Sequence, residues 1–207
     1  VGDELLIRLR HRHVAVLLLE RLVDALHVEG DVLRLAQKLL RALDVWRERL
    51  ATSGISAGDV VLLTADFSPS STVALLALWE RQCIVVPLSR AVAGQRTELL
   101  AIAEADVDFT ITNDDEAEFT RFGRATSHHP LYRQLRDADV PGLVLFSSGS
   151  SGKPKAIVHD ASKLLEKFKT PRHAKRTITF LSFDHIGGIN TLLHVLSNTG
   201  TVVTGPD

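Results

Sequence analysis

Between residues 60 and 112 the sequence alternates between short apolar runs and longer segments with helical spacing. The apolar runs are VVLLTA (60–65), CIVVPL (83–88) and VDFTIT (107–112), and the segments 68–82 and 94–106 separate them. Runs without polar alternation are typical of strands buried on both faces, and strand–helix–strand order at this spacing favours a parallel sheet. We therefore predict an α/β fold, with a parallel-rich sheet flanked by helices.

The same periodicities extend the prediction in both directions. Apolar residues recur at helical spacing from Asp31 to about Leu50, and Ser53-Gly54 suits the end of that helix. Residues 1–28 predict an edge hairpin, and the charged residues 113–140 predict a surface excursion with little strand character and a short helix near 131–138. The remaining predictions are strands at 142–146, 156–160, 176–181 and 201–203, and helices at 161–169 and 186–197.

Composition excludes several classes of protein. A formal net charge of -1 gives no indication of a nucleic-acid partner. The longest apolar runs fall well short of the roughly 20 residues that a membrane helix needs. The single Cys83 excludes an intramolecular disulfide and fits a reducing compartment, so we expect a cytoplasmic protein.

Six consecutive small residues, Ser147 to Gly152, lie between the strand at 142–146 and Lys153-Pro154-Lys155. A flexible linker is unexpected there, because strands of one sheet flank the run within a few residues, and expression tags lie at termini. The Walker pattern fails, because Ser147 stands where it requires Gly and Pro154 where it requires Ser or Thr. The Rossmann glycine pattern is absent as well.

The interpretation that uses every residue of the run is a different phosphate cradle. Gly149 and Gly152 lack a Cβ, so their backbone N–H groups can approach an anion closely. Lys155 supplies a fixed positive charge at the start of the next strand. Hydroxyl donors come from Ser147, Ser148, Ser150 and Ser151.

The stretch LVLFSSGSSGKPKAIVH resembles the signature of the adenylate-forming superfamily, which includes acyl- and aryl-CoA ligases, nonribosomal adenylation domains and luciferases. Its usual form is an aromatic residue followed by T/S-S-G-T/S-T/S-G-x-P-K-G. Nine positions between Phe146 and Lys155 agree, and Ala156 replaces the commonest Gly. Residues 54–89 and 182–203 resemble further stretches of the family, so the resemblance covers roughly residues 14–207. It implies that residues 1–207 form the N-terminal portion of an AMP-binding domain.

Members of this superfamily activate a carboxylate with ATP. The carboxylate attacks the α-phosphorus to give an acyl-adenylate and pyrophosphate, and many members pass the acyl group to the thiol of CoA or of a carrier protein's phosphopantetheine arm. By resemblance, the loop 147–155 would hold the β- and γ-phosphates, with Lys155 as a charge partner. His185 would be catalytic near the acyl pocket and the α-phosphate, where Gly187 and Gly188 would let the backbone approach the substrate. The alternative is that His185 caps the helix beginning near residue 186; we expect Asp184 to be a helix cap.

The resemblance thus implies a fragment of an AMP-forming carboxylate ligase that uses ATP and Mg²⁺. By overall similarity, FDHIGG (183–188) favours an acyl-CoA ligase over a peptide-synthetase domain. We therefore expect an acyl-CoA synthetase with CoA as co-substrate, and a role in fatty acid metabolism. Two alternatives stay open, an adenylation domain that loads a carrier protein and a stand-alone, non-catalytic nucleotide-binding module. The family's metal ligand and its C-terminal domain are expected downstream, so no metal-binding residue is assigned, and we expect these 207 residues alone not to form acyl-adenylates. The carboxylic acid and the oligomeric state stay open.

Several conspicuous residues predict structural roles. Adjacent side chains point apart, so His128 and His129 are expected to be structural or exposed rather than to share a metal. Trp46 and Trp79 are expected in the core, and His159 and Cys83 are expected to be structural. The cations between residues 34 and 49 predict a solvated helix face.

Overall fold

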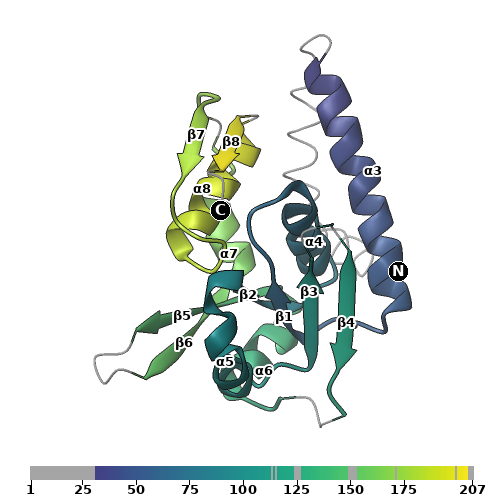
Figure 1. Cartoon of the computed structure of the whole chain (residues 1–207), viewed down its shortest axis with the longest axis vertical. Helices are drawn as coiled ribbons and strands as arrows, with labels where there is room; N and C mark the ends of the chain where they lie inside the picture. The colour runs from purple at the N-terminus through teal and green to yellow at the C-terminus, as the bar shows by residue number, and fades with distance from the viewer. Residues whose placement is uncertain are drawn as a thin grey trace.

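The computed structural model describes residues 31–112, 114, 116–123, 127–148, 153–170, 172–198 and 200–204 (Figure 1). The hairpin predicted for residues 1–28 lies outside these residues. The strands are β1 (Val60–Thr64), β2 (Ile84–Leu88), β3 (Val107–Ile111), β4 (Ala117–Arg121), β5 (Gly142–Ser148), β6 (Pro154–Asp160), β7 (Arg176–Thr179) and β8 (Thr201–Thr204). The helices are α3 (Asp31–Thr52), α4 (Pro69–Glu80), the 3₁₀ helix η2 (Arg90–Gln95), α5 (Arg96–Ala103), α6 (Pro130–Asp137), α7 (Ala161–Glu166) and α8 (Ile186–Ser197).

Six of the strands form one mixed sheet in the order β4-β3-β1-β2-β5-β6. The pairs β1–β2, β1–β3 and β2–β5 are parallel, and the two edge pairs, β3–β4 and β5–β6, are antiparallel. The remaining strands, β7 and β8, pair in parallel and are joined through α8. The predicted α/β class with a parallel-rich sheet is therefore confirmed.

Alternate residues of the central strands bury into two apolar clusters on opposite faces of the sheet, because successive strand side chains point to opposite sides. The larger cluster joins one face to α3, α4, α7 and α8, and its members include Leu43, Trp46, Val61, Leu63, Leu75, Trp79, Val85, Leu143, Leu145, Leu165, Phe183 and Leu192. The smaller cluster joins the other face to α5 and α6, and its members include Val60, Leu62, Ile84, Val86, Leu99, Tyr132, Leu135 and Val144. The chain thus forms three layers, helix, sheet and helix.

Helix α4 is buried along most of its length and is fixed at both ends. Ser68 and Ser71 form a reciprocal capping box, in which each backbone N–H donates to the other hydroxyl, at 3.0 and 2.9 Å. At the other end, the indole Nε1 of Trp79 donates to the carbonyl of Gly142 at 3.0 Å. Trp46 and Trp79 are 3% and 1% exposed, which confirms their predicted place in the core.

The segment 113–140 holds more regular structure than the sequence predicts. Strand β4 pairs with β3, with Phe119 opposite Phe109, and helix α6 buries Tyr132 and Leu135. The charged residues of β4 hid its strand character from the sequence prediction. They are compatible with its position at the edge of the sheet that the described residues form. Arg121, for example, pairs with Asp59 and donates to the Gly54 carbonyl at 2.9 Å.

None of the helices in the described ranges combines the length and the apolar character required to cross a bilayer.

Candidate functional site

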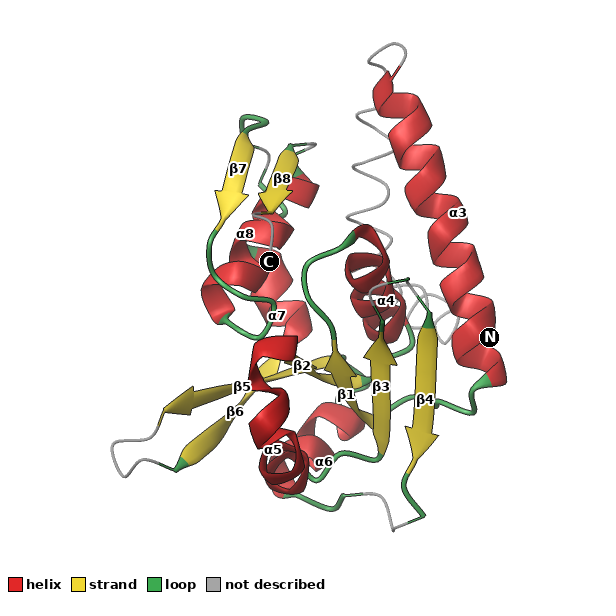
Figure 2. Ribbon diagram, viewed as in Figure 1, coloured by secondary structure: helices red, strands yellow, loops and turns green. Residues whose placement is uncertain are grey.

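The predicted phosphate loop connects the ends of two adjacent antiparallel strands. Ser148 at the end of β5 lies opposite Pro154 at the start of β6. Four of the predicted phosphate-binding residues, Gly149, Ser150, Ser151 and Gly152, lie outside the described residues, and Ser148 is described by its backbone alone. The hairpin that carries the loop extends away from the helices of the molecule (Figure 2).

The two predicted residues that flank this loop, Ser147 and Lys155, lie directly opposite each other in the β5–β6 register. Opposed residues of an antiparallel pair place their side chains on the same face. That face also carries Leu143 and Leu145 of the larger cluster. The same cluster contains Phe183, which precedes the predicted site residue His185 by two positions. Lys155 is exposed, and its ammonium group forms no hydrogen bond or ion pair with another described residue. Its positive charge is therefore available to an anion at the end of the hairpin.

His185 stands at the N-cap of α8 and is exposed. Its Nδ1 accepts a hydrogen bond from the Gly187 N–H at 3.0 Å. The capping alternative for His185 is therefore realised. Because Nδ1 acts as the acceptor, the neutral ring carries its proton on Nε2, which can donate to another group. A catalytic role for His185 stays a prediction. Because the capping bond occupies Nδ1, Nε2 is the nitrogen that would perform this role.

Asp184 was expected to cap the helix, and this expectation is wrong. Its Oδ2 accepts from both the backbone N–H and the hydroxyl of Ser89, at 3.0 and 2.8 Å, and its Oδ1 accepts from the Ser182 hydroxyl. The carboxylate turns toward the end of β2 because His185 already supplies the cap of α8.

Gly187 and Gly188 form the first turn of α8 against the preceding loop. A Cβ on Gly188 would lie 2.2 Å from the Ser182 carbonyl oxygen and 2.8 Å from that of Leu181. A Cβ on Gly187 would lie 2.3 Å from Cδ1 of Leu181, which is a side chain and can move. The packing of the protein itself therefore requires a glycine at position 188, whereas the approach of a substrate there stays a prediction.

The carboxyl ends of β1 and β2 are a topological switch point of the sheet, which was not predicted from the sequence. These strands are adjacent, but the chain leaves β1 toward α4 on one face and β2 toward α5 on the other. Such a switch point is where open α/β sheets commonly bind ligands. Here Asp66 accepts from the Arg90 N–H at 3.1 Å, and the Arg90 guanidinium donates to the Ile111 carbonyl at 2.8 Å. Asp66 and Arg90 each lie within two residues of the end of an apolar run, and this position is the sequence signal that could have identified them.

His159 is half-buried in β6, opposite Leu143. Burial lowers the pKa of its imidazole below the ordinary value of 6.5, because apolar surroundings disfavour the charged ring. The unfolded chain then binds the proton more readily than the folded chain, so stability is lost as the pH falls through 6.5 and below.

The variant His159→Gln should therefore lose less stability than the wild-type protein when the pH is lowered from about 7.5 to about 5. Urea unfolding at each pH measures this difference. Equal losses in the two proteins would show that His159 does not contribute to the acid sensitivity.

Other conspicuous residues hold structural positions. His129 caps α6, where its Nδ1 accepts from the Leu131 N–H at 3.3 Å. Cys83 is fully buried, and burial raises the pKa of its thiol, which makes the reactive thiolate inaccessible. Within the described ranges, no three His, Cys, Asp or Glu side chains gather as a metal site would require.

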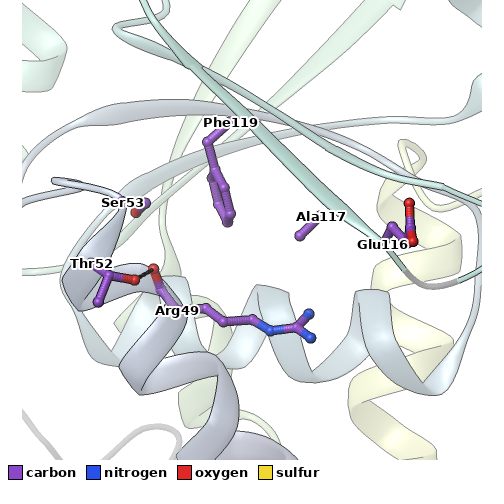
Figure 3. Close-up of a pocket in the computed structure, with 6 residues that line it drawn as sticks. All are labelled: Arg49, Thr52, Ser53, Glu116, Ala117 and Phe119. Carbon is purple, nitrogen blue, oxygen red and sulfur yellow. Dashed lines mark hydrogen bonds between the residues drawn. The ribbon is translucent and has the colours of Figure 1, made fainter.

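A hollow of about 330 Å³ lies between the end of α3 and β4, far along the sheet from the β5–β6 hairpin (Figure 3). Its lining residues are Arg49, Thr52, Ser53, Glu116, Ala117 and Phe119. The Arg49 guanidinium lies 5.0 Å from the centre of the Trp46 ring, so packing accounts for its position. None of the predicted site residues lines this hollow, and we assign it no function.

Comparison with known proteins gives three kinds of similarity. A family model described as AMP-binding enzyme matches residues 39–207. The chain is 28% identical over 159 residues to a carboxylic acid reductase of Mycobacterium tuberculosis, covering 73% of this chain and 12% of that protein. It is 26% identical over 217 residues to the nonribosomal peptide synthetase fmqA of Aspergillus fumigatus, covering 96% of this chain and 5% of that protein.

Among solved structures, the N-terminal subdomain of Klebsiella oxytoca NpsA has a TM-score of 0.63 at 18% identity, covering 83% of this chain and 48% of that chain. NpsA-ThdA, an artificially fused adenylation–PCP di-domain from the same organism, has a TM-score of 0.60 at 18% identity, covering 83% and 37%. These similarities show a shared fold. The chain spans about half of that solved subdomain, and 12% or less of the two curated relatives.

Proposed function

The chain belongs to the AMP-binding enzyme family, and from this premise we propose that it supplies the N-terminal part of a domain that activates a carboxylic acid with ATP as an acyl-adenylate. The observation that carries the proposal is the pairing of Ser147 with Lys155 at the base of the signature loop. This pairing places a hydroxyl and an ammonium group without a partner among the described residues on one face of the hairpin, where both can meet a polyphosphate.

The acceptor that we propose for the acyl group is the thiol of a carrier protein. The relatives described above are a peptide synthetase, a carboxylic acid reductase and an adenylation–PCP fusion, in which PCP denotes a carrier protein. They favour loading of a carrier protein. Transfer to CoA, the outcome that FDHIGG led us to expect, is less favoured. They do not support the assignment to fatty acid metabolism.

Lys155 and His185 define what this part of the chain would contribute. Lys155 would neutralise phosphate charge, and the Nε2–H of His185 would donate a hydrogen bond near the reacting groups. Mg²⁺ usually binds through one or two carboxylates together with substrate phosphates. The described residues bring together no group of three or more His, Cys, Asp or Glu side chains, and we assign none of them to the ion.

Replacing Lys155 by alanine should weaken the binding of ATP·Mg²⁺ and of inorganic pyrophosphate by about 10- to 100-fold, the value of one hydrogen bond to a charged group. Isothermal titration calorimetry of the 207-residue chain measures both dissociation constants. Lys163→Ala is the matched control, because its side chain is 85% exposed and lies on α7 beyond the hairpin. Unchanged affinity in Lys155→Ala, or no binding by the wild-type chain, would argue against the proposal.

Nucleotide binding and catalysis can be separated in the same preparation. We expect ATP binding without carboxylate-dependent exchange of labelled pyrophosphate into ATP. Such exchange, if observed, would show that this chain is sufficient for adenylate formation.

A further inference from the structure

Two carboxylates bind two consecutive backbone N–H groups directly after β2. The Ser89 N–H donates to Asp184 Oδ2 at 3.0 Å, and the Arg90 N–H donates to Asp66 Oδ1 at 3.1 Å. Asp66 follows β1, whereas Asp184 comes from the loop before α8, 95 residues further along the chain than Ser89. The end of β2 is therefore the point at which three separate segments of the chain are tied together.

The contact between Asp184 and Ser89 is protected from water on the Ser89 side. Ser89 is 4% exposed, and its hydroxyl adds a second donor to the same carboxylate oxygen, at 2.8 Å. The neighbouring residue Phe183 is 1% exposed and packs edge-on against Phe67, with ring centres 5.4 Å apart. A charged acceptor with two donors, beside a buried aromatic pair, makes this a strong attachment of the loop to the six-stranded sheet.

The attachment adjoins a predicted site residue. Asp184 precedes His185, whose Nδ1 accepts a hydrogen bond from the Gly187 N–H. Both Asp184 oxygens already accept hydrogen bonds, from Ser89 and from Ser182, so this carboxylate is committed to holding the chain. The first turn of α8 has no other polar attachment to the end of β2 within the residues that the structure describes.

We propose that Asp184 is a positioning residue, which clamps the loop before α8 to the end of β2 and thereby sets the place and the ring orientation of His185. The relevance of this clamp to catalysis rests on the proposed function, whereas the clamp itself is a property of the fold. Ser89 is its partner, and the two residues act as one unit.

The test uses amide hydrogen exchange together with the side-chain nitrogen shifts of His185, both measured by NMR on the 207-residue chain. In the variant Asp184→Ala, the Gly187 and Ser89 amides should exchange at least about tenfold faster, whereas the amides of β1 should keep their rates. The nitrogen shifts of His185 should move from a fixed Nε2–H tautomer toward an average of the two tautomers. A purely global destabilisation would instead accelerate exchange at all of these amides.

Conservative variants sharpen the test. Asp184→Asn keeps an acceptor oxygen and should restore most of the protection at Gly187, and Ser89→Ala should lose part of it. Ser89→Ala removes only the hydroxyl donor and keeps the Ser89 N–H, so Asp184→Asn should have a smaller effect in the Ser89→Ala background than in the wild-type chain. Glu166→Gln is the matched control, since this carboxylate is 60% exposed and pairs with Lys169 on the surface. If Asp184→Ala does not yield folded protein, Ser89→Ala and Asp184→Asn still decide the question.

The clamp would be overturned if Asp184→Ala kept the wild-type exchange rates and His185 shifts. If Asp184→Ala does not fold, the same result in Ser89→Ala would overturn it. This outcome is independent of the nucleotide titrations. The absence of ATP binding would refute the proposed function and leave the clamp intact.

Discussion

Replacing Trp79 by alanine is expected to lower the free energy of unfolding by about 3–5 kcal/mol, the usual cost of removing a large buried aromatic side chain. Trp79 is 1% exposed and lies at the end of α4, where its indole donates to the Gly142 carbonyl at 3.0 Å. The variant loses both the packing and the bond that ties α4 to the first residue of β5. Because small domains are stable by only about 5–15 kcal/mol, this loss is a large share of the total.

Urea unfolding followed by circular dichroism measures the effect of Trp79→Ala. Trp79→Phe keeps most of the buried area and loses the donor, so it should cost less than the alanine variant. Val45→Ala on α3 is the control, because Val45 is 48% exposed and its loss should stay within about 0.5 kcal/mol. Similar losses in Trp79→Ala and Val45→Ala would contradict this account of α4.

Gly188→Ala should destabilise the protein by about 1–3 kcal/mol, as expected where an added methyl group meets fixed atoms. The new Cβ would lie 2.2 Å from the Ser182 carbonyl oxygen, so the loop or the first turn of α8 must shift. That shift would also displace His185, whose imidazole accepts from the adjacent Gly187. We therefore expect altered His185 nitrogen shifts together with the loss of stability.

Gly94→Ala is the matched control for Gly188→Ala. A Cβ on Gly94 would have no atom within 4 Å, and its backbone is not left-handed, so alanine should be neutral or slightly stabilising. Thermal unfolding of both variants makes the comparison. If Gly188→Ala unfolds at the wild-type temperature, the close packing of α8 on its loop is not a constraint.

Periodicity in the sequence was sufficient to predict most of the fold. The helix expected at 186–197 matches α8, and the helix predicted from Asp31 to about Leu50 matches α3 within two residues. These segments have uniform local signals, such as an apolar stripe or a capping residue. The same applies to the strands on either side of the signature loop, which the structure extends to Ser148 and Pro154.

Strand β4 could not be predicted because its local signal conflicts with its tertiary setting. Its five residues, AEFTR, include two charges, which are disfavoured in central strands and tolerated at an edge. Only the pairing with β3 reveals the strand, and that pairing depends on Phe119 meeting Phe109, with ring centres 4.4 Å apart.

The sequence likewise predicted one part of the candidate site and missed another. The loop residues and His185 were identified from a contiguous motif, since a motif keeps its residues in fixed order. The contacts of Asp184 with Ser89 and of Asp66 with Arg90 join residues 95 and 24 positions apart, and no spacing rule predicts such pairs. Asp184 was predicted to cap α8 because it lies close to the start of that helix. His185 supplies the cap instead, and Asp184 accepts from the Ser89 N–H.

Strand β5 pairs with β2 only through Gly142 and Leu143, whereas it pairs with β6 along its whole length, from Gly142 to Ser148. Packing nevertheless holds β5 further along, because the side chains of Val144 and Leu145 are buried in the two apolar clusters. Ser147 and its partner Lys155 lie only about 7 Å beyond Leu145, at the usual rise of a strand. A rotation of about 5° at Leu145 would therefore move the backbone of Lys155 by only about 0.6 Å. The packing of the sheet thus fixes the position of the charge at the end of the hairpin.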